Sequence, residues 1–222
     1  MTREPFLRTR AGRVALLAML LIDVFVVPVL IKLEALTPRV GDVVFAVTMI
    51  VAITSFGTGK GRRGVLAVAI AACAVQFLHL VAHGRAMDIA DASLSALAMG
   101  TFAAMVLVDV TSSDPMPDRL IDVILAYVLV GAMFAFVYEI VDVAVPGALL
   151  LDGHSMGVSD YVYSSFTTMT SVGYGDALPM HPISRTVAMG EALTGQLYVA
   201  VLIARFATQR RLASQHPDGD AG

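Results

Sequence analysis

The stretch that decides the architecture is Thr168-Met169-Thr170-Ser171-Val172-Gly173-Tyr174-Gly175-Asp176. Gly173 and Gly175 can take backbone conformations with positive φ, which other residues meet at a steric cost. The stretch lies in a long loop, Asp142 to Pro182, between two apolar runs. The same loop contains a semi-apolar segment, Tyr161–Thr170, that is too short to cross a bilayer. We therefore expect a re-entrant element followed by a glycine-dependent turn.

The composition places the chain in a membrane. Of its 222 residues, 57% are hydrophobic and only 15% are charged, and the mean hydropathy is +0.78. An ordinary soluble domain of this length is far less apolar. The net charge of -3 indicates no particular partner, and nothing in the sequence suggests nucleic acid. The single cysteine, Cys73, cannot form an intrachain disulfide.

Apolar runs of bilayer-spanning length predict six transmembrane helices. A spanning helix needs about 17–25 such residues. The predicted spans are Val14–Ile31, Val40–Phe56, Gly64–Ala82, Ala92–Val110, Leu120–Val141 and Ser184–Ala207. The expected fold class is therefore an all-α membrane protein of six transmembrane helices, with the re-entrant segment and the glycine-containing loop between the fifth and the sixth.

The lysines and arginines near helix ends predict the orientation, because they gather on the cytoplasmic side. If the N-terminus is cytoplasmic, only Lys32, Arg39, Arg85 and Arg185 lie outside, and all other basic residues lie inside. Both termini are then cytoplasmic, and the long loop after the fifth helix faces outward. We expect a multi-pass protein of the plasma membrane.

The glycine-containing stretch resembles the signature of potassium channels, which is rich in threonine and ends in Gly-Tyr-Gly-Asp. The resemblance covers residues 120–207, and the whole chain looks like the bacterial six-helix potassium channel family. It implies a four-helix N-terminal bundle at 1–115, a pore domain at 116–208, and a short disordered cytoplasmic tail at 209–222. It also implies a homotetramer in the lipid bilayer, because the ring around the ion needs one filter strand from each of four chains.

The resemblance further implies a selectivity filter made of Ser171, Val172, Gly173, Tyr174 and Gly175. Potassium would bind at the first four of these residues, where oxygens facing one axis replace the water shell of the ion. Ser171 stands where the family most often has threonine. Thr170 and Asp176 would support the filter. Tyr174 would point away from the pore and brace it, near Tyr161 or Tyr163.

The elements around this filter follow from the same resemblance. Tyr161–Thr170 would be the pore helix, with its N-cap at Ser159 or Asp160. Gly195 lies twenty residues after Gly175, where the inner helix of the family carries a gating hinge. Steps of four residues then place three further side chains on one helix face. We expect these to line the cavity and the inner gate: Val199, Ile203 and Ala207.

The first four predicted helices lack a voltage sensor. A sensor needs arginines at every third position of its fourth helix, and Ala92–Val110 contains neither lysine nor arginine. We therefore expect weak voltage dependence. Acidic residues within apolar helices are either functional or locally paired. For Glu191 we favour a contact behind the filter, to Arg185 or to a pore-helix hydroxyl, and for Asp23 and Asp109 both possibilities stay open.

Other function classes have less support. A weakly selective cation channel is favoured only by Ser171. A potassium transporter would carry four filter-like repeats in one chain, and a membrane enzyme or receptor would need a nucleophile with its base, a metal set or a nucleotide motif. A chance glycine-rich turn is the simplest alternative for Val172–Asp176. We expect no enzyme and no cofactor besides K⁺ as the permeant ion. The sequence does not identify a gating stimulus or a regulatory ligand.

Overall fold

The computed structural model describes residues 10–37, 40–41, 43–45, 47–48, 51, 67, 70–75, 78, 84–112 and 120–214. The predicted spans Val40–Phe56 and Gly64–Ala82 lie largely outside these residues.

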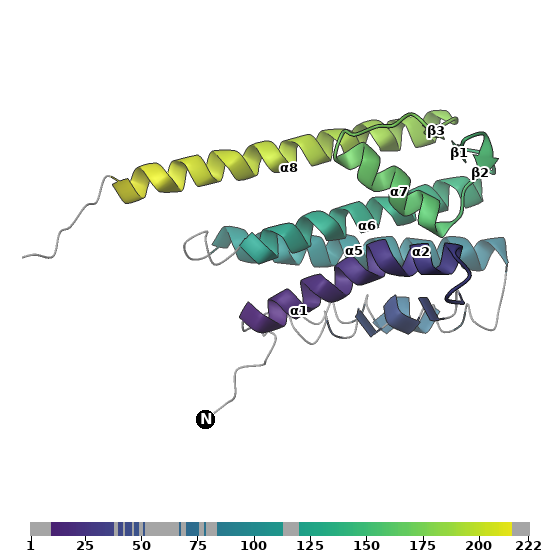
Figure 1. Ribbon diagram of the computed structural model, residues 1–222, viewed down its shortest axis with the longest axis horizontal. Helices are drawn as coiled ribbons and strands as arrows, with labels where there is room; N and C mark the ends of the chain where they lie inside the picture. The colour runs from purple at the N-terminus through teal and green to yellow at the C-terminus, as the bar shows by residue number, and fades with distance from the viewer. Residues whose placement is uncertain are drawn as a thin grey trace, which may run out of the picture.

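Long helices form a bundle, and three short strands gather at one of its ends (Figure 1). The helices are α1 (Arg10–Leu21), the π-helical turn η2 (Ile22–Val26), α2 (Val27–Lys32), α5 (Arg85–Ser112), α6 (Leu120–Ala144), α7 (Val158–Met169) and α8 (Pro182–Ser214). The strands are β1 (Leu149–Leu151), β2 (His154–Ser155) and β3 (Ala177–Pro179).

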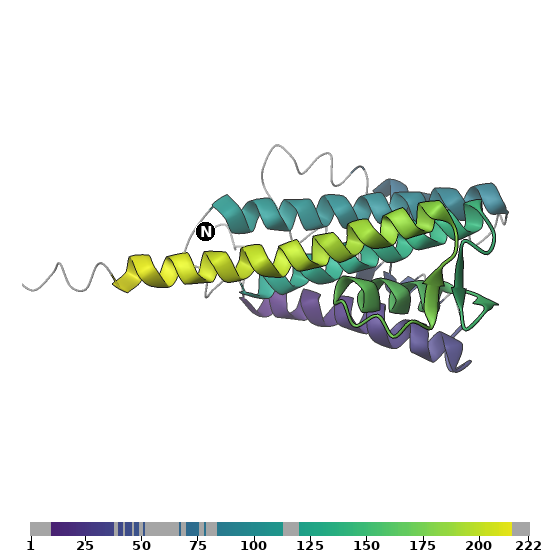
Figure 2. The same cartoon turned by 90° about the horizontal axis from the view of Figure 1, so that it is seen from above.

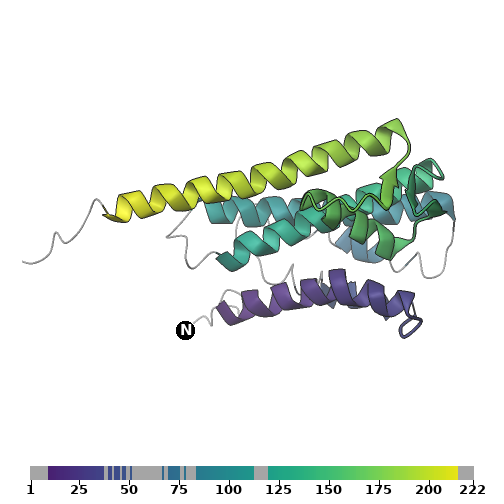
Figure 3. The same ribbon diagram turned by 45° about the horizontal axis from the view of Figure 1, so that its top comes forward.

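Among the described residues, four helical stretches are long and apolar enough to cross a membrane. They are Gly12–Lys32, Arg85–Val108, Leu120–Ala144 and Pro182–Arg205. Four of the predicted spans are thus helices in the structure. The beginning of α1 and the end of α8 lie at the same end of the bundle, opposite the strands (Figures 1 and 3).

Helix α8 corrects one predicted boundary. We expected a disordered tail from residue 209, but the helix continues to Ser214. The residues Gln209-Arg210-Arg211-Leu212-Ala213 are good helix formers, and arginines near a helix C-terminus interact favourably with its dipole. The polar character of the residues after 208, on which the prediction of a disordered tail was based, therefore did not end the helix.

The packed core joins α5 and α6 and includes the first helix. Met99, Phe102 and Val106 of α5 are buried in one cluster with Leu125 and Leu129 of α6. Many neighbours of these side chains are alanines, and small residues let helices in a membrane approach closely. Leu16, Leu20 and Val24 belong to the same cluster. The first helix therefore belongs to the packed core. Figure 2 shows it beside α6 and α7, which it contacts.

A small sheet frames the outer loop, and it corrects the all-α prediction. Strand β1 pairs antiparallel with both β2 and β3, in the order β2-β1-β3. The turn between β1 and β2 is Asp152-Gly153, with φ of 48° and 79°, which suits a tight hairpin. The strands have only two or three residues, too few for an alternating pattern to show in the sequence. Because β1 precedes α7 and β3 follows the glycine-containing stretch, their pairing fixes both ends of the loop.

Candidate functional site

Helix α7 carries the glycine-containing stretch at its C-terminal end. The helix covers Val158–Met169, and its N-cap is Gly157, not Ser159 or Asp160 as predicted. Asp160 is the third residue of the helix, and its Oδ2 accepts a hydrogen bond from the Gly157 amide at 3.0 Å. The carboxylate thus caps the helix from inside its first turn, a position at which acidic side chains reach back to the N-cap.

The backbone after α7 takes positive φ at three alternate residues. Gly173 and Gly175 have φ of 52° and 83°, as expected from their residue type. Ser171 has φ of 59°, which was not predicted. A left-handed conformation costs a residue with a Cβ about 1–2 kcal/mol, so surrounding contacts must hold Ser171 in place.

The first three amides of this segment donate hydrogen bonds, whereas its carbonyls accept none among the described residues. The amides of Val172 and Gly173 both donate to the Thr167 carbonyl, at 2.9 and 3.2 Å. Within the described part of the chain, no carbonyl oxygen of residues 171–175 accepts a hydrogen bond. Buried backbone carbonyls normally have partners, but these residues are exposed in the single chain. The segment thus presents five consecutive uncommitted oxygens, which are ligands that a hard cation prefers.

Two tyrosines and an aspartate brace the outer end of this segment. The rings of Tyr163 and Tyr174 stack with centroids 6.3 Å apart and an interplanar angle of 2°. The Tyr163 hydroxyl donates to Asp176 Oδ2 at 2.6 Å. This hydrogen bond raises the pKa of Tyr163 to about 12 and lowers the pKa of Asp176. Tyr163 is thus the tyrosine that contacts Tyr174; Tyr161 donates instead to Asp142 Oδ2 at 2.8 Å.

A buried polar cluster joins α6, α7 and α8 behind the segment. Glu191 is 0% exposed, and the Tyr138 hydroxyl donates to its Oε2. The Ser165 hydroxyl lies 2.5 Å from Glu191 Oε1 and 2.7 Å from the Gly131 carbonyl. The Ser165 hydroxyl thus has two acceptors within reach, the Glu191 carboxyl and the Gly131 carbonyl. These contacts tie α7 to α8 and to α6.

This cluster settles the predicted contact of Glu191. Of the two partners considered, the structure provides a hydroxyl of α7, that of Ser165. Arg185 donates instead to the Pro179 carbonyl at 3.0 Å.

Helix α8 passes very close to the end of α7 at Gly195. A Cβ at this position would lie 2.1 Å from the Met169 carbonyl oxygen. The helix runs through Gly195 without interruption, and the close approach gives this glycine a packing role. The gating hinge at Gly195 stays a prediction. The next residue, Gln196, donates through Nε2 to Ser171 Oγ at 2.8 Å. This contact, absent from the sequence analysis, helps to hold the strained Ser171.

The predicted cavity-lining face of α8 is open in the single chain. Val199 is 44% and Ile203 is 63% exposed, and Ala207 is also exposed. Only 11% of the membrane-crossing stretch of α8 is buried, against 50% of that of α6. An apolar helix with so little of its surface covered by its own chain needs other partners in the membrane.

Two further acidic residues position α7, and the sequence analysis assigned neither role. Asp142 accepts from the Leu149 amide at 3.1 Å and from Tyr161, which links α6, β1 and α7. Asp160 forms an ion pair with Lys32 at 2.5 Å, between the end of α2 and the first turn of α7. No sequence spacing signals the second pair, because 128 residues separate its members. Asp23 is buried, and the side chain of Asp109 lies outside the described part of the structure.

Comparisons with known proteins agree with this geometry. Residues 123–210, which include α7 and most of α6 and α8, match a family model described as an ion channel. The inward rectifier potassium channel Kirbac3.1 of Paramagnetospirillum magnetotacticum is 32% identical over 79 residues, which are 34% of this chain and 24% of that protein. The chain thus spans about a quarter of the length of this relative. No solved structure matches. The chain is a mostly helical membrane protein with an ion-channel domain.

We predict that Gly195→Ala destabilises the protein, whereas Gly190→Ala does not. The added Cβ at Gly195 meets backbone, and at Gly190 it meets no atom within 4 Å in the described structure. Overpacking of this kind costs about 1–3 kcal/mol. Thermal unfolding of the purified variants, followed by circular dichroism, measures the difference. Equal unfolding temperatures for the two variants would show that α8 does not contact α7 here.

We also predict that Tyr163→Phe raises the pKa of Asp176 towards its ordinary value of 3.8. The lowered pKa means that the Tyr163–Asp176 contact is intact above that ordinary value and is lost as the pH falls through the lowered one. Carbon-13 NMR of labelled aspartates measures the titration, with the signal assigned from Asp176→Asn. Tyr161→Phe is the control, since Tyr161 bonds Asp142. A pKa of Asp176 that Tyr163→Phe leaves in place would contradict the assigned cause.

Proposed function

We propose that the chain is a subunit of a potassium-selective channel and that Ser171–Gly175 forms its filter. One observation carries the proposal: residues 171–175 present consecutive carbonyl oxygens without hydrogen-bond donors in the described chain. A potassium ion gives up its water shell only for oxygens that are already arranged around it. Positive φ at alternate residues is how a backbone turns successive carbonyls towards one side.

The proposed pore is a homotetramer. One chain supplies a single strand of oxygens, and a cage around an ion needs a ring of them. The small covered share of α8 supports this assembly, since the helix would line the cavity with one face and meet neighbouring subunits with others. Val199, Ile203 and Ala207 are proposed to line the cavity and the inner gate. The pore helix α7 would direct the negative end of its dipole to the ion in this cavity.

The contacts around the segment are suited to keeping it in shape. Thr167 holds two filter amides from α7, Tyr163 holds Tyr174 and Asp176 from the side, and Glu191 ties α8 to α7 behind them. Such support matters because unliganded carbonyls repel one another. In this proposal Thr170 and Asp176 remain supporting residues, and K⁺ binds at Ser171, Val172, Gly173 and Tyr174.

The rest of the predicted architecture belongs to the same proposal. It comprises six transmembrane helices, a re-entrant α7, and both termini on the cytoplasmic face of the plasma membrane. The common location of the two described ends, opposite the strands, supports this topology. The similarity of the pore region to a protein named as a potassium channel supports the choice of ion.

A channel with weaker selectivity is the second candidate. Ser171 is strained, and its Oγ accepts a hydrogen bond from Gln196, which leaves this hydroxyl less free to coordinate an ion. Reversal potentials measured with potassium on one side and sodium on the other separate the two candidates.

We predict that Gly173→Ala abolishes potassium selectivity. Its φ of 52° costs alanine about 1–2 kcal/mol in every subunit. Because each subunit of the proposed tetramer carries the substitution, every carbonyl of the ring at this position would shift. Flux of K⁺ and of Na⁺ into proteoliposomes should show the ratio of K⁺ to Na⁺ entry falling about tenfold or more, since each 1.4 kcal/mol is a factor of ten. Gly190→Ala is the control. An unchanged ratio of K⁺ to Na⁺ entry in Gly173→Ala would refute the filter assignment.

We further predict that opening depends only weakly on voltage. One elementary charge moved through the field contributes about 2.3 kcal/mol per 100 mV, and steep gating needs several charges in each subunit. The only basic residue of α5 is Arg85, at its first position, where it donates to the Val143 and Ala144 carbonyls at the end of α6. Conductance measured against voltage in symmetric potassium should change gradually. A steep sigmoidal curve with gating currents would overturn this prediction.

A further inference from the structure

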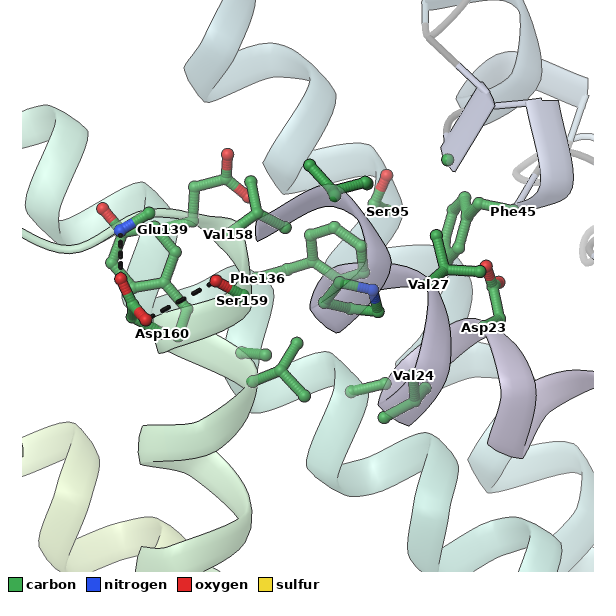
Figure 4. Close-up of a pocket in the computed structure, with 18 of the residues that line it drawn as sticks. Asp23, Val24, Val27, Phe45, Ser95, Phe136, Glu139, Val158, Ser159 and Asp160 are labelled. Carbon is green, nitrogen blue, oxygen red and sulfur yellow. Dashed lines mark hydrogen bonds between the residues drawn. The ribbon is translucent and has the colours of Figure 1, made fainter. Parts of the chain in front are cut away.

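A pocket of about 530 Å³ lies between the first helix and the pore region. Figure 4 shows it, bounded by η2 and α2 on one side and by α5, α6 and α7 on the other. Its size is that of sites for small organic molecules. It shares none of the residues proposed to conduct ions.

The walls of this pocket are mainly apolar. Val24, Val27 and Pro28 contribute from the first helix, and Phe45 and Phe136 contribute aromatic rings. Such walls favour a hydrocarbon body over a hydrated solute. A molecule dissolved in the bilayer has this character.

The carboxyl group of Asp23 lies at one end of the pocket. It is 7% exposed and lies beside Phe45 (Figure 4). Its Oδ2 has no hydrogen-bond partner among the described residues. Asp23 lies near the middle of the span Gly12–Lys32, where an unpaired carboxylate is expensive. At the opposite end, Asp160 already has a partner in Lys32.

A bare metal ion does not fit this lining. Among the described residues, no group of three or more histidine, cysteine, aspartate or glutamate side chains could hold a metal. Hard cations need about six or more oxygen ligands, and aliphatic and aromatic carbons occupy most of the surface around Asp23. A cation with its own apolar body suits both the carboxylate and the walls.

We propose that this pocket binds a lipophilic organic cation whose ammonium group pairs with Asp23. The ammonium donates to Oδ2, and a charge-assisted hydrogen bond of this kind is about twice as strong as a neutral one. The hydrocarbon part lies against Val24, Val27 and Phe136. The site is independent of the proposed conduction, because it requires only the fold of the single chain.

The experiment measures binding directly. The full chain is purified into nanodiscs, and isothermal titration calorimetry compares 1-aminoadamantane with its neutral isostere 1-adamantanol, after subtraction of the heat with empty nanodiscs. We expect one amine per chain, bound at least tenfold more tightly than the alcohol. This comparison needs no variant and therefore does not depend on how a substitution folds.

Three variants locate the amine. Asp23→Asn should weaken its binding at least tenfold, and Asp23→Glu should retain most of it. Asp152→Asn makes the same change of charge in an exposed turn outside the pocket and should have no effect. Equal binding of amine and alcohol, amine binding that survives Asp23→Asn, or no binding at all would each overturn the proposal.

Discussion

The contact on which the site depends is the close approach of α8 to the C-terminal end of α7. At Gly195 no side chain separates the helix from the Met169 carbonyl. This approach sets the depth at which α7 ends, and hence where residues 171–175 begin. Gln196 then reaches Ser171 from the same turn of α8. A bulkier residue at position 195 would push α7 away from α8, so the missing Cβ at Gly195 helps to position the whole loop that follows α7.

The second constraint is the satisfaction of polar groups inside an apolar bundle. Glu191, Ser165 and Tyr138 form hydrogen bonds among three helices, and Asp142 binds both β1 and Tyr161. Each group alone would be costly in a membrane, whereas together they have specific partners. Because the partners lie on different helices, the clusters fix how α6, α7 and α8 are placed around residues 171–175. Apolar contacts are not directional, so by themselves they would define the relative positions of these helices less precisely than the hydrogen bonds do.

The first helix is joined to the later helices in three ways, although the family match begins only at residue 123. Leu16 and Leu20 belong to the core cluster of α5 and α6, and Phe25 meets Phe166 with ring centroids 4.7 Å apart. Lys32 then pairs with Asp160 at the first turn of α7. A displacement of the first helix would therefore be passed to α7 through these contacts. The pocket at Asp23 lies within this connection, so a ligand there would contact both the first helix and α7.

The sequence by itself determined the membrane setting, four of the helices and the position of the glycines, because hydropathy and backbone freedom are local properties of the chain. It also indicated that Tyr174 has an aromatic neighbour and that Glu191 has a buried partner. Only the tertiary structure decided which partners these are, since Tyr163, Ser165 and Lys32 meet their contacts across the fold. The three strands, the strained φ of Ser171 and the packing role of Gly195 depend on neighbours distant in sequence, and periodicity cannot report them.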